Sequence, residues 1–271
     1  MTGHQPRRVA IGGLGAIGMA VAQRLDRGID GLDLAAVSAR DAARAEAAVS
    51  GFARPVPVLP LARLWEAAEI VVECAPAALL RELAEPALAQ GRIVMVLSCG
   101  ALVDNFDLVA LACRHGGRVL VPTGALIGLD AVAAAAEGGI SRVHMVTRKP
   151  PGGLAGAPYL LENGIGIDGL SEAKRVFAGN AHEAARGFPA NVNVAAALAL
   201  AGIGPERTTI EIWADPAITR NTHRIEVEAE AARFSMQIEN VPSENPKTGR
   251  LTPLSVVAAL KKLVSPLAVG T

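Results

Sequence analysis

The sequence has few aromatic residues, few cysteines and no excess of charge. Of its 271 residues, 3% are aromatic and three are cysteine, while 26 Lys and Arg balance 26 Asp and Glu. The balance is also regional, because residues 1–122 carry 12 charges of each sign and the remaining residues carry 14. A protein that binds nucleic-acid phosphates needs a concentrated basic surface, and unpaired bases need aromatic platforms. We therefore expect no nucleic acid among the partners.

The three cysteines, Cys74, Cys99 and Cys113, form no CxxC pair and have no histidine at metal-ligand spacing beside them. An odd set of thiols without local pairing favours a reducing compartment, so we expect a cytoplasmic protein without a metal site. No run approaches the roughly 18 uninterrupted apolar residues of a membrane-spanning helix, which predicts no membrane partner. Residues 7–22 imitate a signal peptide, but the glycines among them suggest a different explanation.

These glycines follow the first predicted strand. Residues 9–11 are apolar, Gly13, Gly15 and Gly18 then form a GxGxxG motif, and residues 19–25 have a helical composition. Between a strand and a helix, the first glycine makes a tight turn, the second lets a pyrophosphate approach and the third lets the helix pack on the strand. The helix N-terminus, with Ala16 and Ile17, presents N–H groups to the phosphates. The motif predicts a dinucleotide site, and the alternative is a glycine-rich turn without a ligand.

The residues after the second predicted strand bear on the choice of dinucleotide. NAD sites place an acidic residue about 20 residues beyond the glycines, where it takes the ribose hydroxyls. This sequence has Ser38 and Arg40 in that region, followed by Asp41. A small hydroxyl and a cation accommodate a 2′-phosphate, so we expect NADP to bind at least as well as NAD unless Asp41 turns inward. A solvated Arg40 at a helix start is the alternative.

The fold class predicted is α/β, with two kinds of sheet. In residues 1–122, apolar strands alternate with helices, which predicts a Rossmann-type parallel-sheet domain. In residues 123–245, the runs 208–213, 222–229 and 233–239 follow one another with little helix between them, which predicts an α+β domain with a largely antiparallel sheet. Residues 246–271 contain a helix, predicted over 256–264, that we expect to return to the first domain.

One histidine lies on a predicted buried strand face. In the run that begins at Thr222, His223 alternates with polar residues and shares its face with Ile225, Val227 and Ala229. An imidazole on a covered face, just after a Pro-containing loop, is well placed to act as a general base. The alternative is a core histidine that is hydrogen-bonded to the backbone.

Five segments together resemble the L-aspartate dehydrogenase family. They are residues 13–18 (GLGAIG), 122–130 (PTGALIGLD), 188–196 (FPANVNVAA), 215–223 with its DP and NTH, and 243–248 (SENPKT). The resemblance implies that Ala125 and Asn193 contact a nicotinamide cofactor, NAD or NADP, and that His223 is the catalytic acid/base. It also implies a second domain that carries the substrate and the surface of a homodimer.

The family's activity implies an oxidation of L-aspartate at its amine carbon. Loss of hydride gives 2-iminosuccinate, a candidate precursor for NAD biosynthesis, and water activated by His223 then yields oxaloacetate and ammonia. A dianionic substrate needs cations or N–H donors at both carboxylates. The first candidates for these contacts are Lys247 and Thr248, and the second candidates are Arg148 and Arg220. A solvated Lys247 is the alternative.

Two other functions remain open from the residues. One is a reductase of an imine dicarboxylate similar to dihydrodipicolinate reductase, although the paired histidines typical of that enzyme are absent. The other is a non-catalytic nucleotide-sensing module, which needs the GxGxxG motif but no base on the face of His223.

Overall fold

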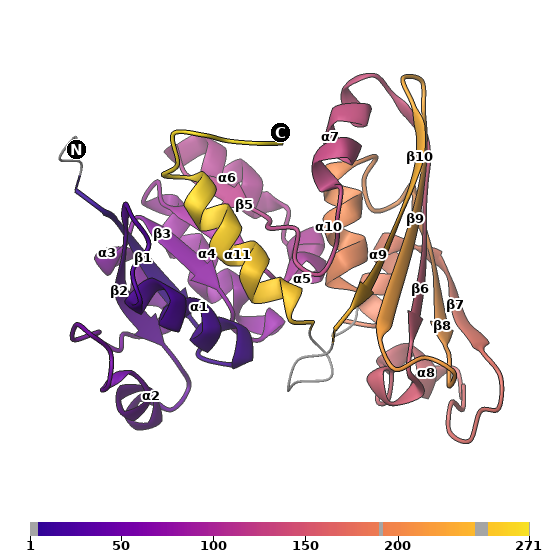
Figure 1. The fold of residues 1–271 in the computed structure, drawn as a ribbon, viewed down its shortest axis with the longest axis horizontal. Helices are drawn as coiled ribbons and strands as arrows, with labels where there is room; N and C mark the ends of the chain where they lie inside the picture. Colours follow the sequence, from indigo (N-terminus) through magenta and orange to yellow (C-terminus); the bar gives the residue numbers. More distant parts are fainter. Residues whose placement is uncertain (1–4, 190–191, 242–248, 271) are drawn as a thin grey trace. The chain divides into compact units, whose positions relative to one another are not determined.

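The structure, a computed structural model, describes residues 5–189, 192–241 and 249–270 (Figure 1). The chain divides into two compact units. Unit 1 comprises residues 1–122 and 253–268, and unit 2 comprises residues 123–252 and 269–271. A five-stranded sheet forms the centre of each unit.

The sheet of unit 1 is parallel throughout, in the order β2-β1-β3-β4-β5. Val9, Ala10 and Ile11 of the interior strand β1 are fully buried, as expected for a sheet covered on both faces. The strand order reverses between β1 and β3, and open α/β sheets bind ligands beyond the carboxyl ends of the strands at such a point. The strands are β1 (Arg7–Gly12), β2 (Leu32–Ser38), β3 (Ile70–Glu73), β4 (Ile93–Val96) and β5 (Arg118–Leu120).

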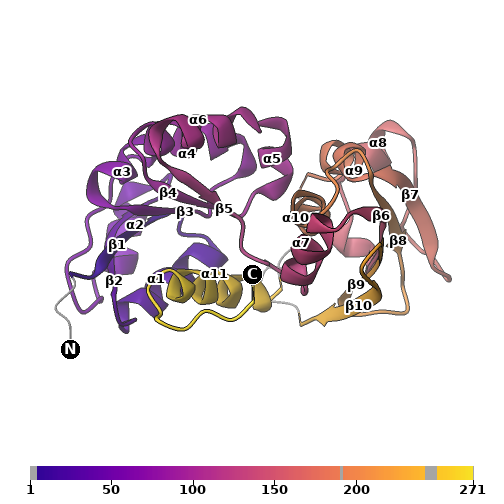
Figure 2. The same cartoon turned by 90° about the horizontal axis from the view of Figure 1, so that it is seen from above.

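Helices cover both faces of this sheet (Figure 2). α1 (Ala16–Asp26) and α11 (Leu251–Lys262) lie on one face, and α3 (Leu64–Ala67), α4 (Leu80–Ala89) and α6 (Asp107–His115) lie on the other. Shorter elements complete the unit: α2 (Ala42–Val49), α5 (Cys99–Asp104), and the 3-10 turns η1 (Leu61–Arg63) and η2 (Ala77–Leu79).

α11 follows unit 2 in the sequence but packs in the core of unit 1. Its side chains Val256 and Leu260 are fully buried, in one apolar cluster with Val9 and Ile11 of β1 and Val21 of α1. The helix begins at Leu251, five residues before the start predicted from the sequence. Unit 1 is therefore completed by residues that lie far from the rest of it along the chain.

Unit 2 contains a mixed sheet in the order β10-β9-β6-β8-β7. The pair β6·β8 is parallel and the other three pairs are antiparallel, which confirms the largely antiparallel sheet. The successive strands β8 and β9 are not neighbours, however, because the earlier strand β6 lies between them. The strands are β6 (Ile140–Lys149), β7 (Lys174–Asn180), β8 (Thr208–Ala214), β9 (Asn221–Ala229) and β10 (Arg233–Asn240).

The helices of unit 2 lie on one face of its sheet (Figures 1 and 2). They are α7 (Leu129–Glu137), α8 (Pro158–Glu162), α9 (Ala181–Gly187) and α10 (Asn193–Ala201), with the 3-10 turn η3 (Pro151–Gly153) after β6. We call the side they cover the helix-covered face and the other side the open face. Three aromatic rings pack together in this unit, with centroids 5.1–5.6 Å apart: Tyr159, Phe177 and Phe188.

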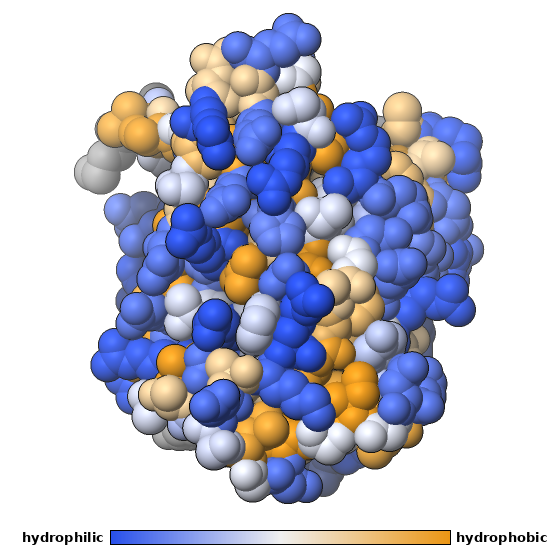
Figure 3. Space-filling model, turned by 90° about the vertical axis from the view of Figure 1, so that its right-hand side faces the viewer, coloured by the Kyte–Doolittle hydropathy of each residue, from blue (hydrophilic) through white to orange (hydrophobic). Residues whose placement is uncertain are grey.

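Ion pairs lie on the open face, both between neighbouring strands and along one strand. Arg142 of β6 pairs with Glu226 and Glu228 of β9, and Arg224 also pairs with Glu226. Figure 3 views the molecule from this side, and hydrophilic side chains cover much of the surface. Because each pair is solvated, it contributes little alone, on the order of 0–1 kcal/mol. The polar alternation nevertheless fixes which side of each strand faces the helices.

Candidate functional site

The glycine motif between β1 and α1 is required by backbone geometry at two positions. Gly13 has φ +102°, which L side chains rarely adopt, and a Cβ there would lie 2.6 Å from the carbonyl oxygen of Cys74. A Cβ at Gly18 would collide with the carbonyl oxygen of Gly13. The backbone N–H of Gly13 also donates to the carbonyl of Ser38 at 2.8 Å, which joins the turn to the end of β2.

Gly15 occupies a different environment, because it is exposed and a Cβ there would meet nothing within 4 Å. It is the N-cap residue of α1, and no side chain caps this helix. The first N–H groups of an α-helix have no partner inside the helix, so those of Ala16, Ile17 and Gly18 are available to an anion. Open space and free donors at the positive end of a helix fit the pyrophosphate of a dinucleotide.

The residues after β2 leave room for either dinucleotide. Ser38 is buried at the strand end and Arg40 is exposed. Asp41 does not turn toward the sheet end, because its Oδ1 accepts a hydrogen bond of 3.0 Å from the backbone N–H of Arg44 and caps α2. The carboxylate that would favour NAD alone is thus used in a helix cap.

Glu73 is a buried acid in this region that was not predicted from the sequence. It is the last residue of β3, and its carboxylate accepts hydrogen bonds from the backbone N–H groups of Leu97 and Ser98 and from the Ser98 hydroxyl, at 3.1, 2.8 and 3.0 Å. Burial raises the pKa of Glu73, and these hydrogen bonds oppose that shift. The carboxylate ties together the carboxyl ends of β3 and β4, where a dinucleotide binds in such sheets.

The cysteines near this sheet end are not activated. Burial raises the pKa of the Cys74 thiol and raises that of the Cys99 thiol to about 12. Both groups therefore remain protonated near neutral pH, and neither has the thiolate character that a nucleophile or redox centre needs.

A second polar cluster lies on the helix-covered face of unit 2. His223 of β9 is 2% exposed and stands directly opposite Thr147 of β6 in the strand register. Thr147 Oγ1 and His223 Nδ1 are 3.1 Å apart and share a hydrogen bond. Lys149, two residues farther along β6, is 4% exposed. The predicted placement of His223 beside Ile225 and Val227 on a buried face is what the strand shows.

Burial controls the protonation of this cluster. Desolvation, and after it the positive charge of Lys149, lowers the pKa of His223 from 6.5 to about 3. Desolvation also lowers the pKa of Lys149 from 10.5 to about 8. Near pH 7 the imidazole is thus neutral, with one ring nitrogen able to accept a proton, and the lysine is a cation.

The other predicted site residues are distributed as follows. Ala125 lies in the turn before α7, and its carbonyl accepts a hydrogen bond of 2.9 Å from the Asn240 side chain at the end of β10. Asn193 is exposed at the start of α10. Lys247 and Thr248 lie outside the described residues. Unit 1 therefore brings the glycine motif together with Ser38, while His223, Ala125 and Asn193 belong to unit 2.

Arg148 does not share the face of His223, because it alternates with Thr147 and Lys149 along β6. Its guanidinium donates to Asp215 Oδ2 at 3.0 Å and lies 5.0 Å from the ring centre of Trp213. Arg220 is exposed in the loop before β9. Lys149, which was not singled out in the sequence, is the cation next to the histidine.

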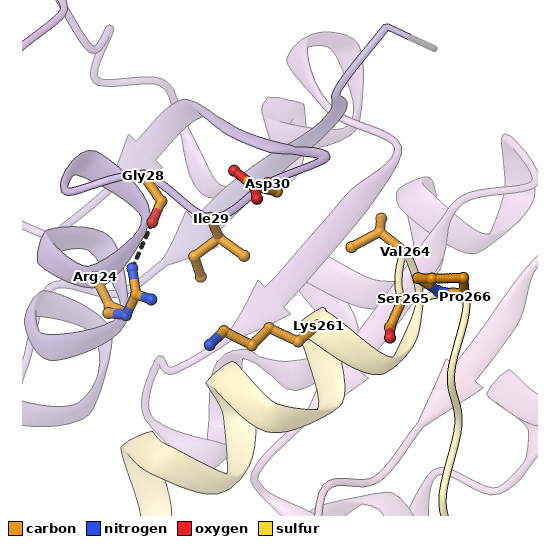
Figure 4. A pocket seen from close by; sticks show the side chains of 8 residues that line it. All are labelled: Arg24, Gly28, Ile29, Asp30, Lys261, Val264, Ser265 and Pro266. Carbon is orange, nitrogen blue, oxygen red and sulfur yellow. Dashed lines mark hydrogen bonds between the residues drawn. The ribbon is translucent and has the colours of Figure 1, made fainter. Parts of the chain in front are cut away.

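A pocket on unit 1 lies away from the glycine motif (Figure 4). It is at the C-terminal end of α1, where Arg24 Nη1 donates to the carbonyl of Gly28 at 2.5 Å. At 1.5 Å per residue, Arg24 is roughly 13 Å along the helix from Gly15, so the pocket is not the dinucleotide site. Its lining consists of Arg24, Gly28, Ile29, Asp30, Lys261, Val264, Ser265 and Pro266.

Two family models match the chain. One, described as "Aspartate dehydrogenase, C-terminal", matches residues 130–263, and the other, "Homoserine dehydrogenase, NAD binding domain", matches residues 13–122. L-aspartate dehydrogenase of Bradyrhizobium diazoefficiens is 59% identical over 270 residues, which cover 100% of this chain and 96% of the relative. The chain belongs to the L-aspartate dehydrogenase family. L-aspartate dehydrogenase 3 of Bordetella bronchiseptica is 55% identical, with 100% of both chains covered.

The fold agrees with this family. The crystal structure of aspartate dehydrogenase from Thermotoga maritima is similar to this chain with a TM-score of 0.73 at 25% identity, covering 97% of this chain and 99% of the other. Membership of the L-aspartate dehydrogenase family confirms the resemblance carried by the five sequence segments, and the matched NAD-binding domain confirms a nicotinamide cofactor. Among the described residues, no helix combines the length and apolar character needed to cross a membrane.

Proposed function

We propose that this protein is an NAD(P)-dependent L-aspartate dehydrogenase, which converts L-aspartate through 2-iminosuccinate to oxaloacetate and ammonia. The observation that carries the proposal is the neutral, buried His223 on the helix-covered face of unit 2, in a chain whose other unit has an open glycine cradle for a dinucleotide. A 59% identical relative with the same printed activity supports it over the full length.

The chemistry divides between cofactor and protein. A bound oxidised nicotinamide would supply the acceptor for the hydride that leaves Cα of the substrate, and loss of that hydride gives the imine. We assign His223 the tautomer in which Nδ1 carries the proton and donates it to Thr147 Oγ1. In that tautomer Nε2 is the ring nitrogen that accepts a proton from water as the water oxygen adds to the imine carbon. Loss of ammonia from the resulting carbinolamine then yields the ketone of oxaloacetate. In sum, aspartate, NAD(P)⁺ and water give oxaloacetate, ammonium, NAD(P)H and one proton.

The protein's own groups hold the two ligands. We assign the pyrophosphate to the N–H groups of Ala16, Ile17 and Gly18, and the adenosine ribose to the region of Ser38 and Arg40. The contacts of Ala125 and Asn193 with the nicotinamide, and those of Lys247 and Thr248 with the substrate, rest on the family resemblance.

A homodimer in the cytoplasm completes the proposal. The family resemblance supports the dimer, and three cysteines without a disulfide support a reducing compartment.

The test is a direct assay of the purified protein with L-aspartate and either NAD or NADP, in which the absorbance of the reduced nicotinamide is followed. We expect reduction with at least one nucleotide, and we expect the His223→Asn variant to bind that nucleotide normally while losing most of its turnover. No reduction with either nucleotide would refute the proposal and favour the imine dicarboxylate reductase or the nucleotide-sensing module. Undiminished turnover in His223→Asn would refute the role of the histidine.

A further inference from the structure

β6 brings a lysine to the same face as the histidine. Thr147 and Lys149 are two residues apart on this strand, so both side chains point to the helix-covered face, and their backbones are about 6.6 Å apart. Thr147 is directly opposite His223 on β9. The ammonium of Lys149 and the imidazole of His223 are consequently close enough to interact electrostatically, and both groups are more than nine-tenths buried.

Among the described residues of the elements packed around His223, Lys149 is the charged group that acts electrostatically on the imidazole. The side chains of β10 on this face, Phe234, Met236 and Ile238, carry no ionisable group, and neither does any residue of α10. The remaining ionisable groups of these elements are on the open face or exposed to solvent: Arg142, His144 and Arg148 on β6, Arg224, Glu226 and Glu228 on β9, Arg233 and Glu239 on β10, and Asp130 and Glu137 on α7.

A cation at this position is costly for folding. Moving an ammonium group out of water carries a penalty of several kcal/mol, and buried lysines respond by losing their proton more easily. Arg148, the neighbouring cation, lies on the open face, where it pairs with Asp215. The site of His223 therefore has its own positive charge, supplied by Lys149.

We propose that Lys149 is a substrate-binding residue, whose ammonium group pairs with a carboxylate of the dicarboxylic amino acid while His223 acts at the amine carbon. This inference rests on the proposed function, because that function makes the substrate a dianion. A charge-assisted hydrogen bond from a buried ammonium to a carboxylate is among the stronger polar contacts in proteins. The same positive charge disfavours protonation of His223. One residue thus both binds the substrate and keeps the imidazole unprotonated, so that it can act as the base.

The test compares Lys149→Met, which has a similar length but no charge, with Lys149→Arg, which keeps the charge. For Lys149→Met we expect the KM for L-aspartate to rise by about tenfold or more, while the Kd for NAD(P) stays unchanged. We also expect the acid limb of the kcat/KM profile to move to higher pH, because removing the nearby charge makes His223 easier to protonate. Lys149→Arg should show a smaller rise in KM.

The matched control is Lys174→Met on β7 of the same sheet, where the lysine is exposed. We expect its KM, Kd and pH profile to equal those of the wild type. An unchanged KM for L-aspartate in Lys149→Met overturns the inference and leaves the proposed function intact. A wild-type protein that fails to reduce NAD(P) with L-aspartate overturns the proposed function instead, before any variant is considered.

A measurement on the wild-type protein covers the case in which Lys149→Met does not fold. Succinate has both carboxylates and no amine, and it is a dianion throughout pH 7–10. If Lys149 binds a carboxylate, the inhibition constant of succinate against L-aspartate rises as the pH passes through the range in which the ammonium loses its proton. An inhibition constant that is independent of pH over this range overturns the inference.

Discussion

Burial sets the charge state of His223, and this has a consequence for stability as well as for chemistry. The folded protein keeps the imidazole neutral down to about pH 3, whereas an unfolded chain protonates it near 6.5. Between these values the unfolded state binds one more proton than the folded state, so the free energy of unfolding falls as the pH falls. The loss begins near pH 6.5 and continues to about pH 3.

The first prediction follows from this proton balance. Between pH 7 and pH 5, His223 should remove about 2 kcal/mol from the free energy of unfolding of the wild type, and His223→Asn should lack that part of the loss. Urea unfolding of both proteins at the two pH values measures the difference, and titration of the carboxyl groups cancels between them. Equal losses in the two proteins would contradict a buried neutral histidine.

A second prediction at this scale concerns Arg40. Since Asp41 caps α2, Arg40 is the charged side chain that we expect to meet a 2′-phosphate. Arg40→Ala should weaken NADP binding by about tenfold, the loss of one charge-assisted contact, and leave NAD binding unchanged. Calorimetric titration with both nucleotides tests this, with Arg44→Ala, another exposed arginine, as the control. A parallel loss for NAD and NADP would refute the assignment.

The sequence revealed a buried site residue only where apolar and polar residues alternate strongly along a strand. His223 was visible because it shares a two-residue period with Ile225 and Val227. The same period in residues 143–149 puts Lys149 on the buried face, but a lysine at a strand end is ordinarily solvated, and composition alone favours that interpretation. Glu73 was hidden because its backbone partners, Leu97 and Ser98, are far away in the sequence and directly follow the neighbouring strand β4.

At the scale of elements, the turn from β1 to α1 contains glycines with two different roles. Gly18 is needed for packing, because a Cβ would meet the backbone of Gly13. Gly15 is needed only for what approaches from outside, since it has φ −71° and open space around it. The motif therefore contains a structural position and a ligand position that substitutions can distinguish.

Gly15→Ala should leave the free energy of unfolding within about 0.5 kcal/mol of the wild type, because the residue is exposed and its backbone is allowed for alanine. The added methyl group stands where the pyrophosphate approaches, so the Kd for NAD(P) should rise by about tenfold or more. Gly18→Ala should instead cost about 1–3 kcal/mol of stability through overpacking. Urea unfolding and nucleotide titration give both quantities, and an unaltered Kd in Gly15→Ala would contradict the cradle.

The packing of α11 on unit 1 leads to a further prediction. Leu260 is fully buried there, so Leu260→Ala should lower the free energy of unfolding by about 2–5 kcal/mol through lost burial and a cavity. Leu254, on the same helix, is 63% exposed, and Leu254→Ala should change stability by less than about 0.5 kcal/mol. Denaturant unfolding of the two variants is the measurement, and equal effects would argue against the packing.

Element types were largely visible in the sequence, but their arrangement was not. Helices and strands of unit 1 follow the apolar pattern, and the strand–turn–helix around the glycines was predicted in full. The sheet of unit 2 was only partly anticipated, because short connections between β8 and β9 favour adjacent strands. The structure instead inserts β6 between them, and pairing over a long sequence separation leaves no local signal.

The whole molecule offers one prediction, which concerns assembly. The proposed homodimer should sediment with about twice the 27.8 kDa mass of the chain. Sedimentation velocity over a hundredfold range of protein concentration measures the mass and shows whether the dimer dissociates. A single species at the monomer mass across that range would refute the dimer while leaving the chemistry of His223 untouched.

The position of α11 in the sequence affects the order in which the protein becomes complete during synthesis. The ribosome makes the strands of unit 1 first, and it makes Val256 and Leu260 of the helix that buries Val9 and Ile11 only after residues 123–252 of unit 2. Until Val256 and Leu260 emerge, the apolar side of β1 and α1 lacks its cover and is a surface that chaperones recognise. A chain that ends before residue 253 thus lacks the helix that covers Val9 and Ile11, and its unit 1 remains unfinished and open to degradation.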